Sequence, residues 1–207
     1  MISGFNTLEV KMARIERDSL GEVEVPEGAY YGSFTVRAKE NFNLSGAGVP
    51  NDLVKALGEI KVAEARVNRE GGYLDNERAE AIVSAAKELV EGQFADQFPL
   101  DMVQAGAGTP IHMNVNEVIA NRATELLGGK RGEYLVHPND HVNMGQSSNN
   151  VIPTALRLVL IRLAGRLVSE LTNLGEALLS KSSEFGGIVK VGRTHYQDAV
   201  PVTLGQE

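Results

Sequence analysis

The spacing of apolar residues along the chain predicts a mostly helical fold. Over residues 51–68 and again over 75–91, apolar side chains recur at intervals of three and four, as they do on one face of a helix. The apolar face of the first segment is imperfect, because one step of the pattern falls at Ile60 and Lys61, and Lys61 is charged. Residues 14–48 lack this period and are punctuated by glycine and proline, so we expect turns and short extended pieces there.

A further helix is predicted over residues 109–127. Thr109 has a side chain suited to a helix N-cap, and Pro110 suits the first helical position. A Gly-Gly pair follows the last apolar residues, as is common after a helix end. The long polar segment that comes next, residues 130–149, is expected to be an ordered loop, and such loops inside compact proteins usually have a function.

The strongest pattern is an apolar seam within a predicted helix over residues 150–185. Asn149 or Asn150 can cap this helix, and Pro153 fits its first turn. Leucines follow at spacings of four and three, at Leu156, Leu160, Leu163, Leu167, Leu171, Leu174 and Leu178. A helix with this seam needs apolar partners on several sides, which indicates the first long helix of a central bundle or a subunit interface.

After this helix, residues 188–191 are predicted to form a short strand and 192–201 a polar loop. Pro201 is expected to open one more helix, for which the sequence leaves no room before Glu207. We therefore expect the chain to be part of a longer protein. The predicted organisation is a tail at 1–13, a small irregular, α-rich N-terminal domain at 14–147, and the start of a helical-bundle domain at 148–207.

Composition and charge narrow the class of protein. Hydrophobic residues make up 43% of the 207, which is enough for a sizeable core. There is no cysteine, so a disulfide framework and a thiolate zinc site are excluded, and the composition suits the cytoplasm. No secretory signal opens the chain and no apolar run approaches the roughly 20 residues of a membrane span. The net charge of −7 argues against nucleic acid as a partner, but not against a locally bound anion.

Three short polar segments have the composition of an anion site: residues 106–109, 146–149 and 192–195. Each offers small residues, hydroxyl groups and free backbone N–H groups near a predicted helix start, which suits carboxylate binding. For any one of them, the commoner role of Ser, Thr and Asn is simply to cap a helix. Three in one chain favour the binding of a small polyanion.

The chain has two candidate groups of histidines. His195 follows Thr194 and has an ordinary pKa near about 6.5, suited to proton transfer or anion contact, although a lone histidine in a loop is more often structural. The neighbouring Arg193 is expected to close a local salt bridge. His137 and His141 have a spacing that a metal ion can use, but two imidazoles without a thiolate make this the minor alternative. We predict no metal and no cofactor.

Taken together, these segments resemble the aspartase and class II fumarase family, in the family's order over residues 14–207. The shared motifs are R-I-E-R-D-S-L-G-E-V-E-V-P-E-G-A-Y-Y-G, G-A-G-T-P-I-H-M-N-V-N-E-V-I-A-N-R-A, H-P-N-D-H-V-N-M-G-Q-S-S-N-N-V-I-P-T-A and G-R-T-H-Y-Q-D-A-V-P-V-T-L-G-Q-E. The wider superfamily shares the Thr-His-x-Gln kernel but lacks the second and third motifs in this form.

The resemblance implies a lyase that carries out reversible anti-elimination from a four-carbon dicarboxylate to give fumarate. A base takes a Cβ proton, and preorganised donors stabilise the resulting aci-carboxylate dianion. The resemblance makes His195 catalytic, and it implies two sets of binding residues. The substrate-binding set is Thr109, Ser147, Ser148, Asn149 and Thr194, and the segment of a second anion site contains His137, Asn139 and Asp140.

Within the family, the sequence favours aspartate ammonia-lyase, which converts L-aspartate to fumarate and ammonia. Ala107 leans this way because fumarases usually have Ser there, and residues 29–32 (Ala-Tyr-Tyr-Gly) lean the same way. Ser148 stands where many aspartases have Thr, and fumarate hydratase is the alternative. His112 stands where the family usually has Asn, and Asn150 where it usually has Asp, which leaves another dicarboxylate open.

The family's proton-abstracting Ser lies on a mobile G-S-S-x-M-P-x-K-x-N loop, and residues 1–207 contain no such stretch. The resemblance also implies a homotetramer whose active sites each draw on three subunits. We therefore expect the full-length protein to be a homotetrameric carbon–nitrogen lyase and the 207-residue chain alone to be inactive. An alternative of another class is a non-catalytic or split subunit that supplies only an anion-binding surface.

Overall fold

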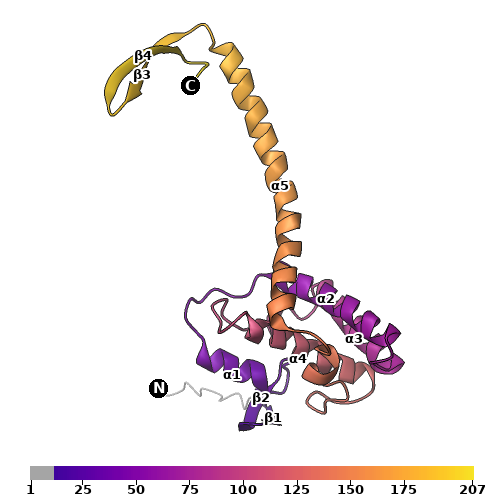
Figure 1. The fold of residues 1–207 in the computed structure, drawn as a ribbon. Coiled ribbons are helices and arrows are strands. Elements are labelled where there is room, and N and C mark those ends of the chain that lie inside the picture. Colours follow the sequence, from indigo (N-terminus) through magenta and orange to yellow (C-terminus); the bar gives the residue numbers. More distant parts are fainter. Residues whose placement is uncertain (1–11) are drawn as a thin grey trace, which may run out of the picture. The chain divides into compact units, whose positions relative to one another are not determined.

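The structure is a computed structural model that describes residues 12–207, and it is mostly helical, as predicted (Figure 1). The chain divides into two units, one ending at Val159 and the other comprising Leu160–Glu207. The predicted tail falls largely outside the described residues.

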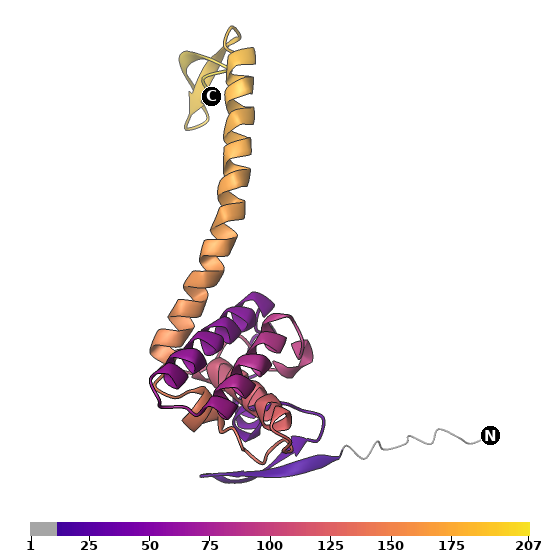
Figure 2. The same cartoon turned by 90° about the vertical axis from the view of Figure 1, so that its right-hand side faces the viewer.

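The first unit opens with an antiparallel hairpin. Strand β1, Ala13–Asp18, pairs with β2, Gly21–Pro26, and the tight turn at residues 19–20 is followed by Gly21, whose φ of +119° is accessible to glycine. Figure 2 shows this hairpin along one side of the helices. The prediction of extended pieces in this region is correct.

The hairpin is followed by α1, Ser33–Asn41, a helix that the sequence pattern did not predict. No side chain next to its start caps it. Instead the carboxylate of Glu117, from a distant helix, accepts hydrogen bonds from the backbone N–H groups of Gly32, Phe34 and Thr35 at 2.9, 2.9 and 3.1 Å. The signal that starts this helix is therefore a tertiary contact, which a local pattern does not contain.

The core of the first unit lies between α2, Asn51–Glu70, α3, Asn76–Val90, and α4, Thr109–Leu126. The α2 and α3 helices match their predicted ranges within two residues, and Asp75 caps α3 by accepting from the N–H of Arg78 at 2.9 Å. The α4 helix contains Thr109 as its first residue, so the predicted N-cap at Thr109 is wrong. The cap is Gly108 at φ +74°, without a side-chain hydrogen bond.

Two short helical turns lie in the connections. A 3₁₀ turn, η1, covers Ala95–Gln97, and a π-helical turn, η2, covers Pro138–Val142 within the long polar segment before the last helix.

The predicted long helix is confirmed as α5, Ser148–Glu184, a continuous helix of 37 residues that begins two residues earlier than expected. The leucines of its seam are 43–62% exposed in the described part of the chain. Their burial in a central bundle therefore stays a prediction. Along residues 12–207, α5 included, no helix combines the length and apolar character needed to cross a membrane.

The second unit ends in a hairpin of β3, Val189–Thr194, and β4, Gln197–Thr203, with an irregularity in register between Val191 and Arg193. The predictions of a polar loop at 192–201 and of a helix opened by Pro201 are therefore wrong. Pro201 pairs with Val191 in β4. Valines at alternating positions favour a strand, and a two-stranded ribbon tolerates proline because each strand has a free edge.

Candidate functional site

The amino-terminal end of α5 gathers three of the predicted binding residues. The carbonyl of Ser147 accepts from the N–H groups of Asn150 and Val151, both at 2.9 Å, and Ser147 Oγ accepts from the N–H of Asn149 at 3.3 Å. Ser147 and Asn149 are exposed, and Ser148 is half-buried. Hydroxyl and amide groups thus surround the positive end of a long helix dipole, an arrangement that attracts a carboxylate.

Behind Ser148 lies a buried polar cluster. Ser148 Oγ is 2.9 Å from His112 Nδ1, and His112 Nε2 is 2.6 Å from Lys61 Nζ. Lys61 and His112 are both fully buried. Lys61 Nζ also lies 2.5 Å from Gln146 Oε1 and 3.4 Å from Asn143 Oδ1. The cluster joins α2, α4 and the segment leading into α5.

Burial sets the charge states in this cluster. Burial lowers the pKa of Lys61 to about 7. Burial, together with the nearby charge of Lys61, lowers the pKa of His112 to about 3, so the imidazole is neutral at pH 7. In the sequence alone Lys61 has no assigned role, and His112 stands out only as a departure from the family pattern. The available signal was a lysine on the apolar face of one helix.

Thr109, at the start of α4, lies near the start of α5. A methyl group added to Gly108 would lie 3.4 Å from the Ile152 side chain of α5. His112, one turn further along α4, is the residue that contacts Ser148. The structure therefore brings the two predicted loops of the first unit to neighbouring helix starts.

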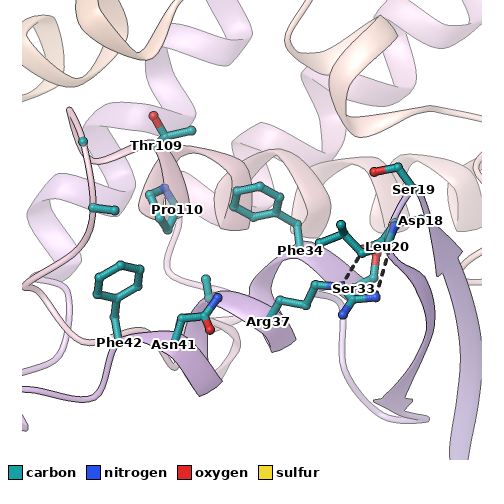
Figure 3. A pocket seen from close by; sticks show the side chains of 13 residues that line it. Asp18, Ser19, Leu20, Ser33, Phe34, Arg37, Asn41, Phe42, Thr109 and Pro110 are labelled. Carbon is teal, nitrogen blue, oxygen red and sulfur yellow. Dashed lines mark hydrogen bonds and ion pairs between the residues drawn. The ribbon is translucent and has the colours of Figure 1, made fainter.

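Thr109 also lines a cavity of about 520 Å³ (Figure 3). Phe34 and Arg37 of α1 line it as well, and Arg37 forms a bidentate ion pair with Asp18 at 2.8 and 3.0 Å. This pairing offsets the charge of Arg37, and most of the remaining lining is apolar. The cavity therefore suits a dicarboxylate less well than the start of α5 does.

The segment predicted as a second anion site forms the η2 turn and uses its imidazoles locally. His137 Nδ1 accepts from the N–H of Asp140 at 3.0 Å, and His141 Nδ1 accepts from the N–H of His137 at 2.8 Å. In residues 12–207, no group of three or more His, Cys, Asp or Glu side chains is arranged to hold a metal ion. An open depression of about 590 Å³, lined in part by Asn139, Asp140 and Ser147, connects this turn with the start of α5.

Thr194 and His195 belong to the second unit, whereas Thr109 and residues 147–149 belong to the first. Thr194 ends β3, and His195 and Tyr196 form the two-residue turn with φ of 51° and 60°. A turn with two residues at positive φ usually contains Asn or Gly, and such conformations in other residues often mark functional sites. All three residues are exposed. The expected local salt bridge of Arg193 is confirmed, with Nε 3.2 Å from Asp198 Oδ1.

Comparison with known proteins yields consistent matches. The family model described as Lyase matches residues 21–207. A class II fumarate hydratase of Halobacterium salinarum is 54% identical over 195 residues, and an aspartate ammonia-lyase of a Bacillus species is 49% identical over 195 residues. Each alignment covers 94% of this chain and 42% of the relative.

The fold is matched as well. The crystal structure of a fumarate lyase:delta crystallin from Brucella melitensis superposes with a TM-score of 0.86 at 47% identity, over 94% of this chain and 43% of that chain. The chain thus spans about two fifths of the length of the curated relatives it matches.

Proposed function

The chain belongs to the fumarate lyase family, and from that premise we propose that the full-length protein catalyses the reversible anti addition of water to fumarate, giving malate. The observation that carries this choice is the set of similar curated proteins, among which those named class II fumarate hydratase outnumber those named aspartate ammonia-lyase. The sequence motifs alone had favoured aspartate, and the relatives shift the preference to the hydratase.

In this proposal, the start of α5 holds a substrate carboxylate. Ser147, Ser148 and Asn149 supply hydroxyl and amide donors, and the helix dipole adds a fixed positive potential. Thr109 contributes a further hydroxyl from the neighbouring start of α4. Donors fixed by secondary structure need no rearrangement as negative charge develops on the carboxylate in the transition state, which is the condition for electrostatic stabilisation.

Thr194 and His195 are proposed to complete the site in an assembled homotetramer, where the family's active sites draw on several subunits. His195 would exchange a proton or contact an anionic oxygen, and its exposed turn leaves it accessible to a partner subunit. The base that takes the Cβ proton in the reverse direction belongs to the family's mobile loop, for which residues 1–207 have no counterpart. The turn that contains His137, Asn139 and Asp140 is proposed as the second anion site.

The second candidate function is the deamination of L-aspartate. Ala107 favours it, because fumarases usually have a serine there and the alanine removes a hydroxyl two residues before Thr109. The similarity to an aspartate ammonia-lyase supports it as well.

The experiment is to measure the ultraviolet absorbance of fumarate when the purified full-length protein is mixed with malate or with aspartate. The hydratase forms fumarate from malate, and Ser147→Ala lowers kcat/KM strongly. Ser183→Ala, an exposed serine near the other end of α5, is the matched control and leaves kcat/KM unchanged. Fumarate from aspartate alone would select the second candidate. Activity with neither substrate would reject both enzymes and leave another dicarboxylate as substrate, or an anion-binding subunit.

A further inference from the structure

Three side chains from three helices form a continuous hydrogen-bonded line to the proposed substrate site. Lys61 of α2 contacts His112 of α4 at 2.6 Å, and His112 contacts Ser148 of α5 at 2.9 Å. Only Ser148 reaches the surface, because Lys61 and His112 are fully buried. The hydrogen bonds along this line have a donor-to-acceptor direction, which is set by the atoms that can donate.

The Lys61 end of the line is fixed first. Gln146 donates from Nε2 to the carbonyls of Val142 and Met144 at 3.0 and 3.4 Å, so its amide orientation leaves Oε1 facing Lys61. Asn143 presents Oδ1 to the same ammonium group. Below its pKa of about 7, Lys61 carries an ammonium group, which has three donors and no acceptor. With two of its protons directed at amide oxygens, the third points at His112 Nε2.

The Lys61 ammonium group also sets the donor and acceptor roles of the two imidazole nitrogens. His112 Nε2 must accept, and because the ring is neutral, its single proton is on Nδ1. Nδ1–H therefore donates to Ser148 Oγ, and the hydroxyl proton of Ser148 is turned away from the histidine.

Resting on the proposed function, we infer that Lys61 and His112 are positioning residues that fix Ser148 as a hydrogen-bond donor to the substrate carboxylate. A hydroxyl can either donate or accept, and a carboxylate can only accept. Setting the direction in advance removes the non-productive orientation before the substrate arrives. His112 is also a residue in which this chain departs from the family pattern.

The first test reads the tautomer directly and needs no turnover. Full-length protein with ¹⁵N-labelled histidine is examined by NMR near pH 6, where Lys61 is protonated and His112 is neutral. The His112 signals are assigned by their loss in His112→Asn. The expected result is a protonated Nδ1 and an unprotonated Nε2. A protonated Nε2 would overturn the inference, whatever the enzyme's activity.

The second test measures the coupling between His112 and Ser148. His112→Phe removes the donor and should raise KM for the dicarboxylate about 10-fold or more, the usual effect of losing a hydrogen bond to a charged group. Ser148→Ala should have a similar effect, and the double variant should be no worse than Ser148→Ala alone. His112→Asn keeps an N–H at the same distance from the backbone and should restore most of the loss. Effects of the two single variants that multiply would contradict the inference.

A second variant keeps the inference testable if His112→Phe does not fold. Lys61→Met removes the donor that fixes the ring, so the His112 signals should shift toward a mixture of tautomers and KM should rise. An unchanged tautomer in Lys61→Met would count against the inference. A wild-type protein that is inactive on both malate and aspartate would refute the proposed function instead, and the tautomer would still decide the hydrogen-bond direction.

Discussion

Glu117 provides the sharpest test of the energetics, because one buried carboxylate caps the start of α1 through residues that lie 82 or more positions earlier in the chain. Its Oε2 accepts from the N–H of Gly32 and from the N–H and hydroxyl of Thr35, the last at 2.6 Å. Its Oε1 accepts from the N–H of Phe34 at 2.9 Å. The proposed change is Glu117→Gln, which preserves the volume and removes the charge and one acceptor.

The magnitude follows from these contacts. The amide oxygen of the glutamine can retain the three donors at the Oε2 position, so its NH₂ group faces the N–H of Phe34. Losing a bond to a charged acceptor costs about 1.5–3 kcal/mol, and the remaining bonds weaken because neutral acceptors bind less strongly. We expect a loss of about 2–4 kcal/mol, a large share of the roughly 5–15 kcal/mol of a typical folded protein.

The assay combines urea unfolding followed by circular dichroism with hydrogen exchange at the amides of Phe34 and Thr35. Both the unfolding free energy and the protection of these amides should fall. Glu80→Gln is the matched control, because the Glu80 side chain is 62% exposed and its pair with Arg69 lies on the surface; it should change stability by less than about 0.5 kcal/mol. If Glu117→Gln changed stability no more than this control, the capping argument would be refuted.

The remaining predictions concern pH, substrate and assembly. Asp101 accepts hydrogen bonds from the hydroxyl of Ser45 and from several backbone N–H groups, and these hold the pKa of its carboxyl well below the ordinary range. The ionised Asp101 carboxylate therefore stabilises the fold fully above an ordinary carboxyl pKa near about 4, and this stabilisation is lost as the pH falls toward the lower pKa of the folded state. In urea titrations, the unfolding free energy of the wild type should exceed that of Asp101→Asn clearly at pH 7 and by less at pH 3. Thr194→Ala in the full-length protein should lower kcat/KM for the dicarboxylate about 10-fold or more with an unchanged unfolding midpoint, and an unchanged kcat/KM would remove Thr194 from the site. The 207-residue polypeptide should show no turnover, because it lacks a general base that typically raises the rate about 10²–10⁴-fold. It should also sediment as an oligomer, because the leucine seam of α5 is exposed. A turnover rate near that of the full-length protein, or sedimentation as a monomer, would contradict these expectations.

The sequence by itself determined the elements whose signals are local. The ranges of α2, α3 and α5 follow mainly from apolar periodicity, a signal that lies inside the helices it defines, whereas the cap predicted for α5 at Asn149 or Asn150 is wrong because the helix already begins at Ser148. The family follows from long motifs in a fixed order, which need no structure to be read. Candidate residues such as Ser148 and Thr194 came from the same motifs, and their roles remain proposals.

Only the tertiary structure decided the features that depend on residues distant in sequence. Helix α1 was missed because its cap is Glu117, and Pro201 was misassigned because its strand is defined by pairing with β3. The hydrogen-bonded line joins Lys61 to His112, 51 residues later, and His112 to Ser148, 36 residues later. The local sequence around each position indicates only an irregular helix face or a helix cap. A buried lysine and a buried histidine are tolerated because each has a hydrogen-bond partner on another helix. The packing of three helices brings these partners together, and the spacing of residues along any one helix does not reveal it.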